Sequence, residues 1–261
     1  MATIIGSLLI LGGLGLFFGL LLSFAGTKLK TKIDPRLSEL IDSLPGVNCG
    51  GCGRPGCGAF AEDLFTEKAE TSGCPVGGEE LNQKLAGIMG VEAAALVRKV
   101  AYVKCIGGES RSTFLYNYEG VINCRALVRL AAGGNKECTK GCLGGESCIQ
   151  SCLFDAIKMV DGIAVIDEEN CTGCNVCVGA CPKHLIEMVP YDKKIRVGCF
   201  AHYGAKTVRE TCTIGCIGCK LCQRNCPEDA VIMDGTLARI NYEKCTNCGV
   251  CVQKCPRKCI L

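Results

Sequence analysis

The sequence lacks several features on which large cores and stand-alone enzymes depend. It contains no tryptophan, and aromatic residues make up 5% of its 261 residues, so any hydrophobic core must be small. No G-x-G-x-x-G motif follows an expected strand, which argues against a dinucleotide-binding fold. No set of nucleophile, base and orienting group stands out either. We therefore expect no stand-alone catalytic site.

Charge is also absent from the N-terminal end of the chain. Ala2 to Thr27 form an uncharged run of 26 residues, and about 20 apolar residues suffice for a helix that spans a bilayer core. A cleaved signal peptide is the alternative, although it would need a basic region before a shorter apolar run. The run predicts a transmembrane helix over residues 1–27. By the positive-inside rule, three lysines that follow place the rest of the chain in the cytoplasm: Lys28, Lys30 and Lys32.

Cysteine, in contrast, is abundant, with 25 residues. In a short secreted chain this content would indicate a disulfide scaffold. Here the number is odd, the cysteines crowd together with two residues between them, and proline repeatedly follows the last of a group. Thiolates that bind metal in a reducing compartment explain this pattern better. Metal ligation must then supply much of the folding free energy.

The densest run of cysteines has the spacing C-x2-C-x2-C-x3-C-P. It consists of Cys171, Cys174, Cys177 and Cys181, followed by Pro182. Bacterial ferredoxins hold [4Fe–4S] clusters with this run, and its fourth cysteine ligates the neighbouring cluster. A zinc site needs only two closely spaced pairs of ligands, so the third crowded thiolate would be surplus. The run therefore predicts iron–sulfur clusters.

The cysteine pattern from Cys138 onwards repeats after 74 residues. Eight cysteines recur in register: Cys138, Cys142, Cys148, Cys152, Cys171, Cys174, Cys177 and Cys181 match Cys212, Cys216, Cys222, Cys226, Cys245, Cys248, Cys251 and Cys255. The repeat indicates two successive modules. Each is expected to contain two half-repeats of a loop, a short helix and a short β-hairpin.

Ligation is expected to be exchanged between the two half-repeats of each module. Three sets are regular: Cys171, Cys174, Cys177 with Cys152; Cys216, Cys219, Cys222 with Cys255; and Cys245, Cys248, Cys251 with Cys226. The fourth set is irregular, because Gly145 occupies the place of Cys219 and Leu153 replaces the usual proline. Cys138 is the expected substitute, which gives the set Cys138, Cys142, Cys148 and Cys181.

A separate motif lies nearer the N-terminus. Cys49, Cys52, Cys57 and Cys74 have the spacing C-x2-C-x4-C-x16-C, with several glycines among them. Glycines let the backbone wrap closely around an inorganic core and direct N–H groups at its sulfides. A short helix between Cys57 and Cys74 is expected to bring Cys74 back to the other three cysteines. The motif predicts one self-contained [4Fe–4S] site, with a zinc site as the alternative.

Five cysteines remain outside these sets: Cys105, Cys124, Cys199, Cys212 and Cys259. They are expected to be buried structural thiols. The alternative is that Cys105, Cys124, Cys199 and Cys212 converge on a sixth cluster. His184 and His202 are expected to face solvent.

These features together predict an α+β protein with about five [4Fe–4S] clusters. Its expected parts are the transmembrane helix (1–27), a small α-helical four-cysteine domain (28–100), a connecting segment (101–137), and two tandem ferredoxin-like modules of two clusters each (138–190 and 191–261).

The whole layout resembles the B subunits of Rnf electron-transport complexes, in their longer form with two ferredoxin-like modules. The resemblance rests on the uncharged N-terminal run, the motif from Asn48 through Cys74, and both modules. It implies an electron-relay subunit of an ion-translocating ferredoxin:NAD oxidoreductase, which pumps Na⁺ or H⁺ across the cytoplasmic membrane. It also implies reduced ferredoxin as electron donor, and partner subunits that span the membrane several times, carry flavin or bind NAD. No nucleic-acid partner is expected.

The alternative function is a reductant-delivery or redox-sensing protein that keeps a regulatory iron–sulfur factor reduced. It would need the same clusters without ion pumping. Docking of ferredoxin would need positive charge near an exposed cluster. The candidate residues are Lys183, Lys193, Lys194, Arg196, Lys220, Arg224, Lys244, Lys254, Arg257 and Lys258.

Overall fold

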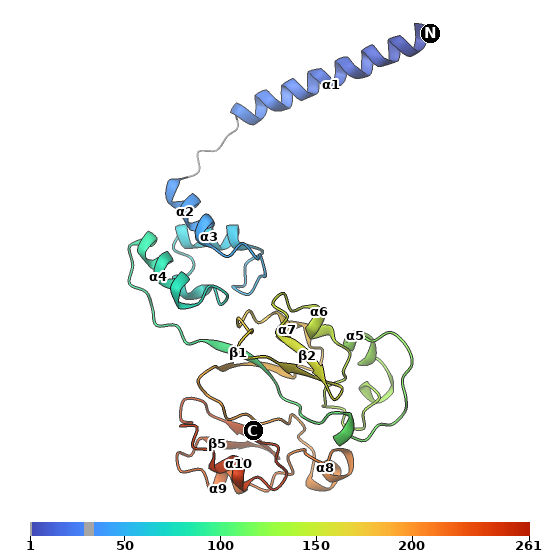
Figure 1. Cartoon of the computed structure of the whole chain (residues 1–261), viewed down its shortest axis with the longest axis vertical. Coiled ribbons are helices and arrows are strands. Elements are labelled where there is room, and N and C mark those ends of the chain that lie inside the picture. Colours follow the sequence, from blue (N-terminus) through green and yellow to red (C-terminus); the bar gives the residue numbers. More distant parts are fainter. Residues whose placement is uncertain (1, 29–33) are drawn as a thin grey trace. The chain divides into compact units, whose positions relative to one another are not determined.

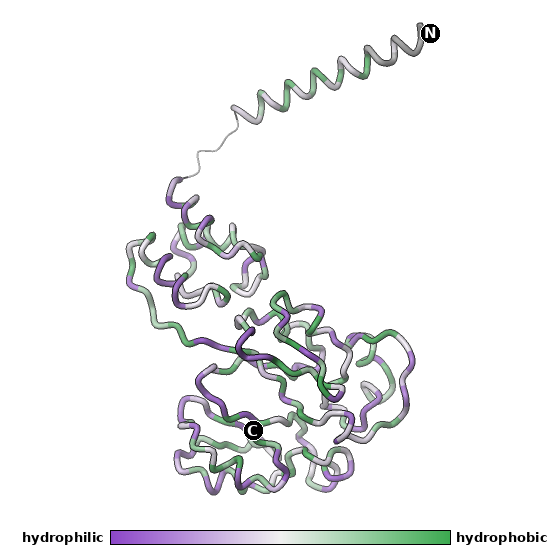
Figure 2. Tube along the Cα trace, in the orientation of Figure 1, coloured by the Kyte–Doolittle hydropathy of each residue, from purple (hydrophilic) through white to green (hydrophobic). Residues whose placement is uncertain are grey.

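The computed structural model describes residues 2–28 and 34–261 (Figure 1). Its contacts divide the chain into two units, Met1–Glu39 and Leu40–Leu261. In the first unit, α1 (Ala2–Lys28) confirms the expected N-terminal helix. Its segment Ile10–Thr27 is long and apolar enough to cross a membrane (Figure 2). Lys30 and Lys32, on which the expected orientation partly depends, lie outside the described residues.

The four-cysteine region is helical, as expected. After α2 (Pro35–Ser43), it contains α3 (Cys57–Phe65), the 3₁₀ turn η1 (Thr71–Gly73) and α4 (Gly78–Met89). Its small apolar core consists of the buried side chains Leu40, Phe60, Leu64, Leu81 and Leu85. Few apolar residues thus hold this region together.

The first ferredoxin-like module contains two antiparallel strand pairs. β1 (Lys99–Val103) pairs with β4 (Ile186–Pro190), and β2 (Ile157–Val160) pairs with β3 (Ile163–Ile166). Its short helices are η2 (Glu109–Arg111), α5 (Cys124–Leu127), η3 (Ala131–Gly133), α6 (Ser147–Gln150) and α7 (Val176–Ala180). Segment 101–137, expected only to connect domains, thus supplies most of β1 and also α5 to this module.

The second module repeats the plan of the first. β5 (Val231–Asp234) pairs with β6 (Leu237–Ile240), and a single antiparallel bridge joins Val197 to Ile260. Its helices are α8 (Ala205–Thr211), α9 (Leu221–Arg224) and α10 (Val250–Lys254). Ile186 of β4 pairs with Val103, and the residue 74 positions after Ile186 is Ile260, which pairs with Val197. Val103 and Val197 therefore occupy equivalent positions in the two modules.

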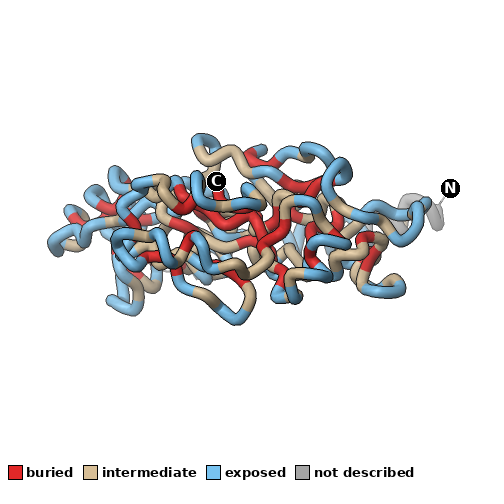
Figure 3. Tube along the Cα trace, turned by 90° about the horizontal axis from the view of Figure 1, so that it is seen from below, coloured by how far each residue is buried: buried red, intermediate tan, exposed pale blue. Residues whose placement is uncertain are grey.

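Each module has its own core, in which cysteines lie among small aliphatic side chains. Ile157, Leu185 and Ile186 are buried in the first module, and Val231 and Leu237 are buried in the second. Figure 3 shows buried stretches throughout the interior of residues 40–261. Because these aliphatic cores are small, cluster ligation has to supply much of the remaining stability.

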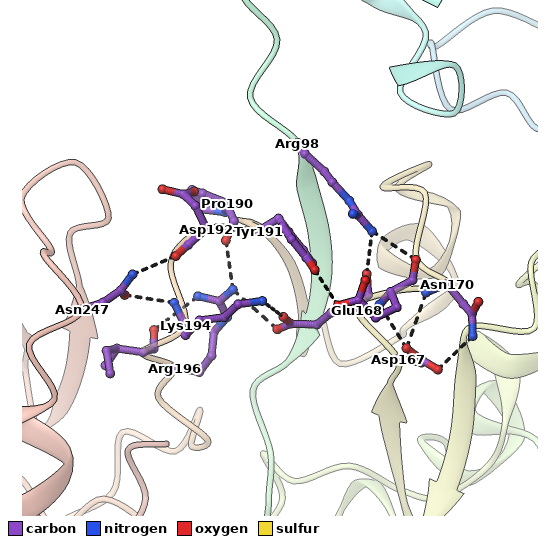
Figure 4. Close-up of polar contacts among 12 residues, drawn as sticks. Arg98, Asp167, Glu168, Asn170, Pro190, Tyr191, Asp192, Lys194, Arg196 and Asn247 are labelled. Atoms are coloured by element: carbon purple, nitrogen blue, oxygen red, sulfur yellow. Dashed lines mark hydrogen bonds and ion pairs between the residues drawn. The ribbon is translucent and has the colours of Figure 1, made fainter. Parts of the chain in front are cut away.

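Polar contacts along residues 190–196 join the two modules (Figure 4). Lys194 Nζ donates to Glu168 Oε2 (2.8 Å) in the first module, and its backbone N–H donates to Asn247 Oδ1 (3.0 Å) in the second. Arg196 is buried, with its side chain 3% exposed, and donates to the Pro190 carbonyl (3.0 Å). The connection between the modules is therefore a packed and hydrogen-bonded segment.

Removal of iron is expected to unfold most of residues 40–261, since their apolar cores are too small to offset the loss of conformational entropy. The measurement is far-UV circular dichroism and hydrogen exchange before and after anaerobic chelation. Helix α1, in detergent, is the internal control and should stay protected. Native-like protection of β5 and β6 in iron-free protein would contradict this expectation.

Candidate iron–sulfur cluster sites

The cysteine loops owe their shape to residues in the left-handed backbone region. The residues preceding α6, α7, α9 and α10 all have positive φ: Glu146 (57°), Asn175 (66°), Lys220 (60°) and Gly249 (73°). Glu146 corresponds to Lys220, and Asn175 corresponds to Gly249, at the spacing of the sequence repeat. Such residues turn successive backbone N–H groups toward one concavity, where they can donate to sulfide and thiolate sulfur.

The N-terminal motif gathers its cysteines on the loop before α3 and the segment after η1. The charges of Cys52 and Cys57 act on Cys74, whose pKa is raised, mainly by burial. The Cys57 N–H donates to Asn48 Oδ1 (2.8 Å), and the Gly51 N–H donates to Cys49 Sγ (3.5 Å). Cys52, Cys57 and Cys74 therefore lie near one another, and that all four cysteines hold one cluster stays a prediction.

The central run forms a second site in the first module. Desolvation raises the pKa of Cys177 to about 12, and the charges of Cys171, Cys174 and Cys152 add to the shift. The structure thus places Cys152, from the other half-repeat, beside the three cysteines of the central run. The Ala101 N–H of β1 also donates to Cys171 Sγ (3.4 Å).

The two sets of the second module are also brought together. Cys216, Cys219, Cys222 and Cys255 line one cavity, together with Cys259. The charges of Cys226, Cys245 and Cys248 act on Cys251, and the Ala230 N–H donates to Cys226 Sγ (3.3 Å). Cys255 thus lies with three cysteines of the other half-repeat, and Cys226 does the same at the second site; that they ligate clusters there stays a prediction.

The irregular site of the first module differs from the expectation. A cavity of about 370 Å³ is lined by Cys142, Cys148, Cys181 and Cys124, together with apolar side chains such as Val103 and Leu185. The charges of Cys142, Cys124 and Cys181 all act on Cys148. The structure therefore brings Cys124 to the place where the sequence predicted Cys138.

Gly145 explains why Cys124 can occupy this place. A Cβ added at Gly145, the residue that replaces Cys219, would lie 2.5 Å from the backbone nitrogen of Cys124. The Cys124 N–H donates to Ser147 Oγ (3.0 Å), which holds α5 against the start of α6. The missing side chain at 145 thus makes room for a cysteine that comes from another segment.

The sequence contains a feature that distinguishes Cys124, but it is recognised only when the equivalent strands of the two modules are aligned. Val103 and Val197 are equivalent, so Cys105 and Cys199 are equivalent as well. Cys105 precedes Cys138 by 33 residues, whereas Cys199 precedes Cys212 by only 13. Cys124 lies within this insertion of 20 residues, which the second module lacks.

The remaining spare cysteines fall into two groups. Cys259 is 2% exposed in the core of the second module, with its Sγ 3.6 Å from Cys255 Sγ, so it fits the interpretation as a buried structural thiol. Hydrogen bonds to Cys216 and Cys255 raise the pKa of Cys259, which keeps it protonated. The other group, which includes Cys138, lines a third cavity: Cys105, Cys138, Cys199 and Cys212.

Burial keeps several site cysteines protonated until a metal binds. Desolvation, aided by neighbouring thiolates, raises the pKa of Cys148 to about 12 and that of Cys222 to about 11. A bound metal cation reverses this preference and deprotonates the thiol. Burial therefore opposes a free thiolate at both positions.

A zinc ion and a [4Fe–4S] cluster require different spacings of their thiol ligands. Within residues 2–28 and 34–261, no three His, Cys, Asp or Glu side chains are close enough together to hold one metal ion. A zinc site would require this closeness, because its thiolates all lie about 2.3 Å from the same metal. In a cubane each thiolate binds a different iron, so the thiols can stand further apart around a cavity.

The candidate docking residues differ in how accessible they are. Those that face solvent are Lys194, Lys220, Arg224, Lys244, Lys254 and Lys258. Arg196 is buried, and Lys193 is half-buried and donates to the Cys245 carbonyl (2.8 Å). Lys183 and Arg257 are half-buried and donate to Thr139 O (2.8 Å) and Cys212 O (2.6 Å), respectively. These four residues therefore serve the internal structure. His184 and His202 are exposed, as expected.

Replacement of Cys124 by Ala is expected to lower the iron content by up to about four atoms per chain, because a cubane has four irons and loses a ligand here. Iron and acid-labile sulfide are measured on anaerobically purified protein. Arg125→Ala, at the exposed next residue, is the matched control and should leave both unchanged. Gly145→Ala should cost about 1–3 kcal/mol through overpacking against Cys124. An unchanged iron content in Cys124→Ala would overturn this ligand.

Comparison with protein-family models agrees with these sites. The model described as "Putative Fe-S cluster" matches residues 44–76. A "4Fe-4S binding domain" model matches residues 164–187, and a "4Fe-4S dicluster domain" model matches residues 207–256. The predicted iron–sulfur character of all three regions is thereby confirmed.

Curated relatives match almost the whole chain. The B subunit of the ion-translocating oxidoreductase complex of Methanosarcina acetivorans is 39% identical over 260 residues, which cover 99% of this chain and 98% of that protein. The B subunit of the Na⁺-translocating ferredoxin:NAD⁺ oxidoreductase complex of Acetobacterium woodii is 42% identical over 252 residues, with coverage of 96% and 75%. The proton-translocating counterpart of Clostridium ljungdahlii is 36% identical over 260 residues, with coverage of 98% and 91%. The chain therefore belongs to the family of B subunits of ion-translocating (Rnf) oxidoreductase complexes, the family that its sequence resembles.

Proposed function

We propose that this chain relays electrons from reduced ferredoxin into a membrane-bound, ion-translocating ferredoxin:NAD oxidoreductase complex. The names of the relatives supply the complex and the reaction. The observation that carries the proposal is the gathering of five sets of four cysteines within one unit, residues 40–261. A [4Fe–4S] cluster bound to each set supplies one-electron transfer.

We assign four of the five ligand sets as the sequence predicts them and revise the remaining one. Cys124 replaces Cys138 in the irregular set, because Cys124 lines that cavity with Cys142, Cys148 and Cys181. The revised set takes three of its thiols from the first half-repeat and the segment before it, and one from the second half-repeat. Its apolar wall keeps water away from the site, which favours retention of the bound cluster.

Neighbouring sites in the first part of the unit lie against one another. A Cβ added at Gly51 would lie 2.6 Å from the carbonyl oxygen of Cys174, so the two loops touch where a glycine permits it. The charge of Cys49 acts on Cys174, and that of Cys148 acts on Cys177. These contacts support a continuous path from the N-terminal motif through both sites of the first module.

Electrons from ferredoxin are proposed to enter at the second module. Cys248 is the one cysteine that is exposed in the described chain. Lys244 and Lys254 flank it in sequence and face solvent, although Glu228 and Asp229 are exposed near Cys226 of the same set. Ferredoxins that carry acidic surfaces would be attracted by the lysines, which increases the rate of encounter at low salt.

The membrane attachment is proposed to come from α1. By length and composition its apolar segment can span a bilayer, and Lys28 at its C-terminal end favours a cytoplasmic position for the cysteine-bearing unit. One helix cannot enclose a path for ions. The Na⁺ or H⁺ pathway, the flavins and the NAD site are therefore assigned to companion subunits.

Reduced ferredoxin is expected to reduce the anaerobically purified complex at a rate that falls steeply between about 50 and about 300 mM salt, since screening weakens charge attraction over this range. Lys244→Glu and Lys254→Glu should slow the low-salt rate about tenfold or more together. Lys84→Glu, in the four-cysteine region, is the matched control. Stopped-flow bleaching of the cluster absorbance gives the rate.

Purification of the same material also discriminates the proposal from reductant delivery. Co-purification with multi-span and flavin-carrying subunits supports the relay function. Isolation as a lone anchored protein, or a rate that does not respond to salt or to either lysine, would contradict the proposal.

A further inference from the structure

A third cysteine-lined cavity lies between the two ferredoxin-like modules. Like the cavities at two of the sites described above, it is lined largely by cysteine-bearing loops. Four cysteines line it, none of which belongs to the five sets: Cys105, Cys138, Cys199 and Cys212. The charge of Cys212 acts on Cys138, so thiols from the two modules are neighbours here.

The four cysteines come in two equivalent pairs, one pair from each module. Cys138 and Cys212 each begin a C-T-x-G-C segment, whose second cysteine belongs to a site within its own module. Cys105 and Cys199 each lie two residues after equivalent strand positions, Val103 and Val197. The two strand ends also meet, because the Ile106 N–H donates to the Gly198 carbonyl (3.1 Å).

Backbone donors surround the sulfurs of this cavity in the same way on both sides. The Cys142 N–H donates to Cys105 Sγ (3.3 Å), and the equivalent Cys216 N–H donates to Cys199 Sγ. The N–H groups of Lys140 and Gly141 donate to Cys138. Such donors stabilise thiolates that ligate a cluster.

A buried positive charge beside the cavity gives an independent indication of an anionic occupant. Lys136 is 2% exposed, and its ammonium donates to the carbonyl of Gly107, which lines the cavity (3.1 Å). Among the described residues, no carboxylate lies within ion-pair distance of Lys136. The charge of Asp161 acts on Lys136 from outside this distance, and the Phe114 ring centre lies 5.6 Å from its ammonium; a nearer anion would stabilise this buried charge further. Lys104 and Lys140 also line the cavity.

We propose that Cys105, Cys138, Cys199 and Cys212 hold an additional [4Fe–4S] cluster between the two modules. With four thiolates an oxidised cubane carries about two net negative charges, which Lys136 and its neighbours offset. Small residues leave room for it, since a Cβ at Gly107 would lie 2.9 Å from Cys212 Sγ. This inference rests on the proposed function in one respect: the additional cluster would carry electrons between the clusters of the two modules.

The cluster count of the full-length chain, prepared anaerobically, tests the proposal. Six clusters predict about 24 iron and 24 sulfide per chain, and five predict about 20 of each. Native mass spectrometry counts the clusters independently of any variant. A wild-type count of five clusters, or one zinc ion with five clusters, would overturn the proposal.

Variants then locate the additional cluster. Cys105→Ala and Cys199→Ala should each lose about four irons and one reducible spin per chain by electron paramagnetic resonance, whereas Arg125→Ala, at an exposed position, should lose none. Lys136→Met should lower the reduction potential of one cluster, and Lys158→Met, at an exposed position, should leave all potentials unchanged. Full iron content in both cysteine variants would overturn the assignment of ligands.

The outcomes for this site and for the relay function are distinguishable. Five clusters in a chain that ferredoxin still reduces would overturn the additional site and leave the relay function in place. Six clusters in a chain that ferredoxin does not reduce would retain the site and overturn the relay function.

Discussion

Ligation by cysteine sulfur is the constraint on which the second unit depends. Its modules bury small aliphatic side chains between two-stranded sheets and helices of four to seven residues, which by themselves cannot offset the entropy of an ordered chain. Loops that contain left-handed residues direct backbone N–H groups at the sulfurs. The chain is thus folded around its cysteine sites, and the apolar core fills the space between them.

The duplication makes the cysteine sites of the two modules similar, and they differ at one position. Gly145 stands where the second module has Cys219, and the backbone of Cys124 occupies the space that a side chain at 145 would need. The replacement uses an insertion of 20 residues that only the first module has. The cavity of the first module thus contains a fourth cysteine that comes from outside the repeat.

The duplicated cysteine loops contribute both to the sites within each module and to the cavity between the modules. In each C-T-x-G-C segment the second cysteine lies in a site of its own module, and the first faces the cavity between the modules. Lys183 and Arg257, which are equivalent in the repeat, both donate to carbonyls of these segments. The hydrogen-bonded segment 190–196 fixes the modules against each other. Contact between the modules is therefore built from the duplicated elements themselves.

The sequence by itself determined the N-terminal helix, the α+β class and the repeat, and it predicts the three regular sets of the modules, because ligand spacing along a short loop is a local property. Only the tertiary structure decided which cavities are lined by Cys105, Cys124, Cys138, Cys199 and Cys212. Their partners are distant in sequence, and β1 pairs with a strand more than 80 residues away. The spacing of cysteines along the chain does not show which single cysteine a strand pairing brings to a cavity. That depends on how the strands and loops pack.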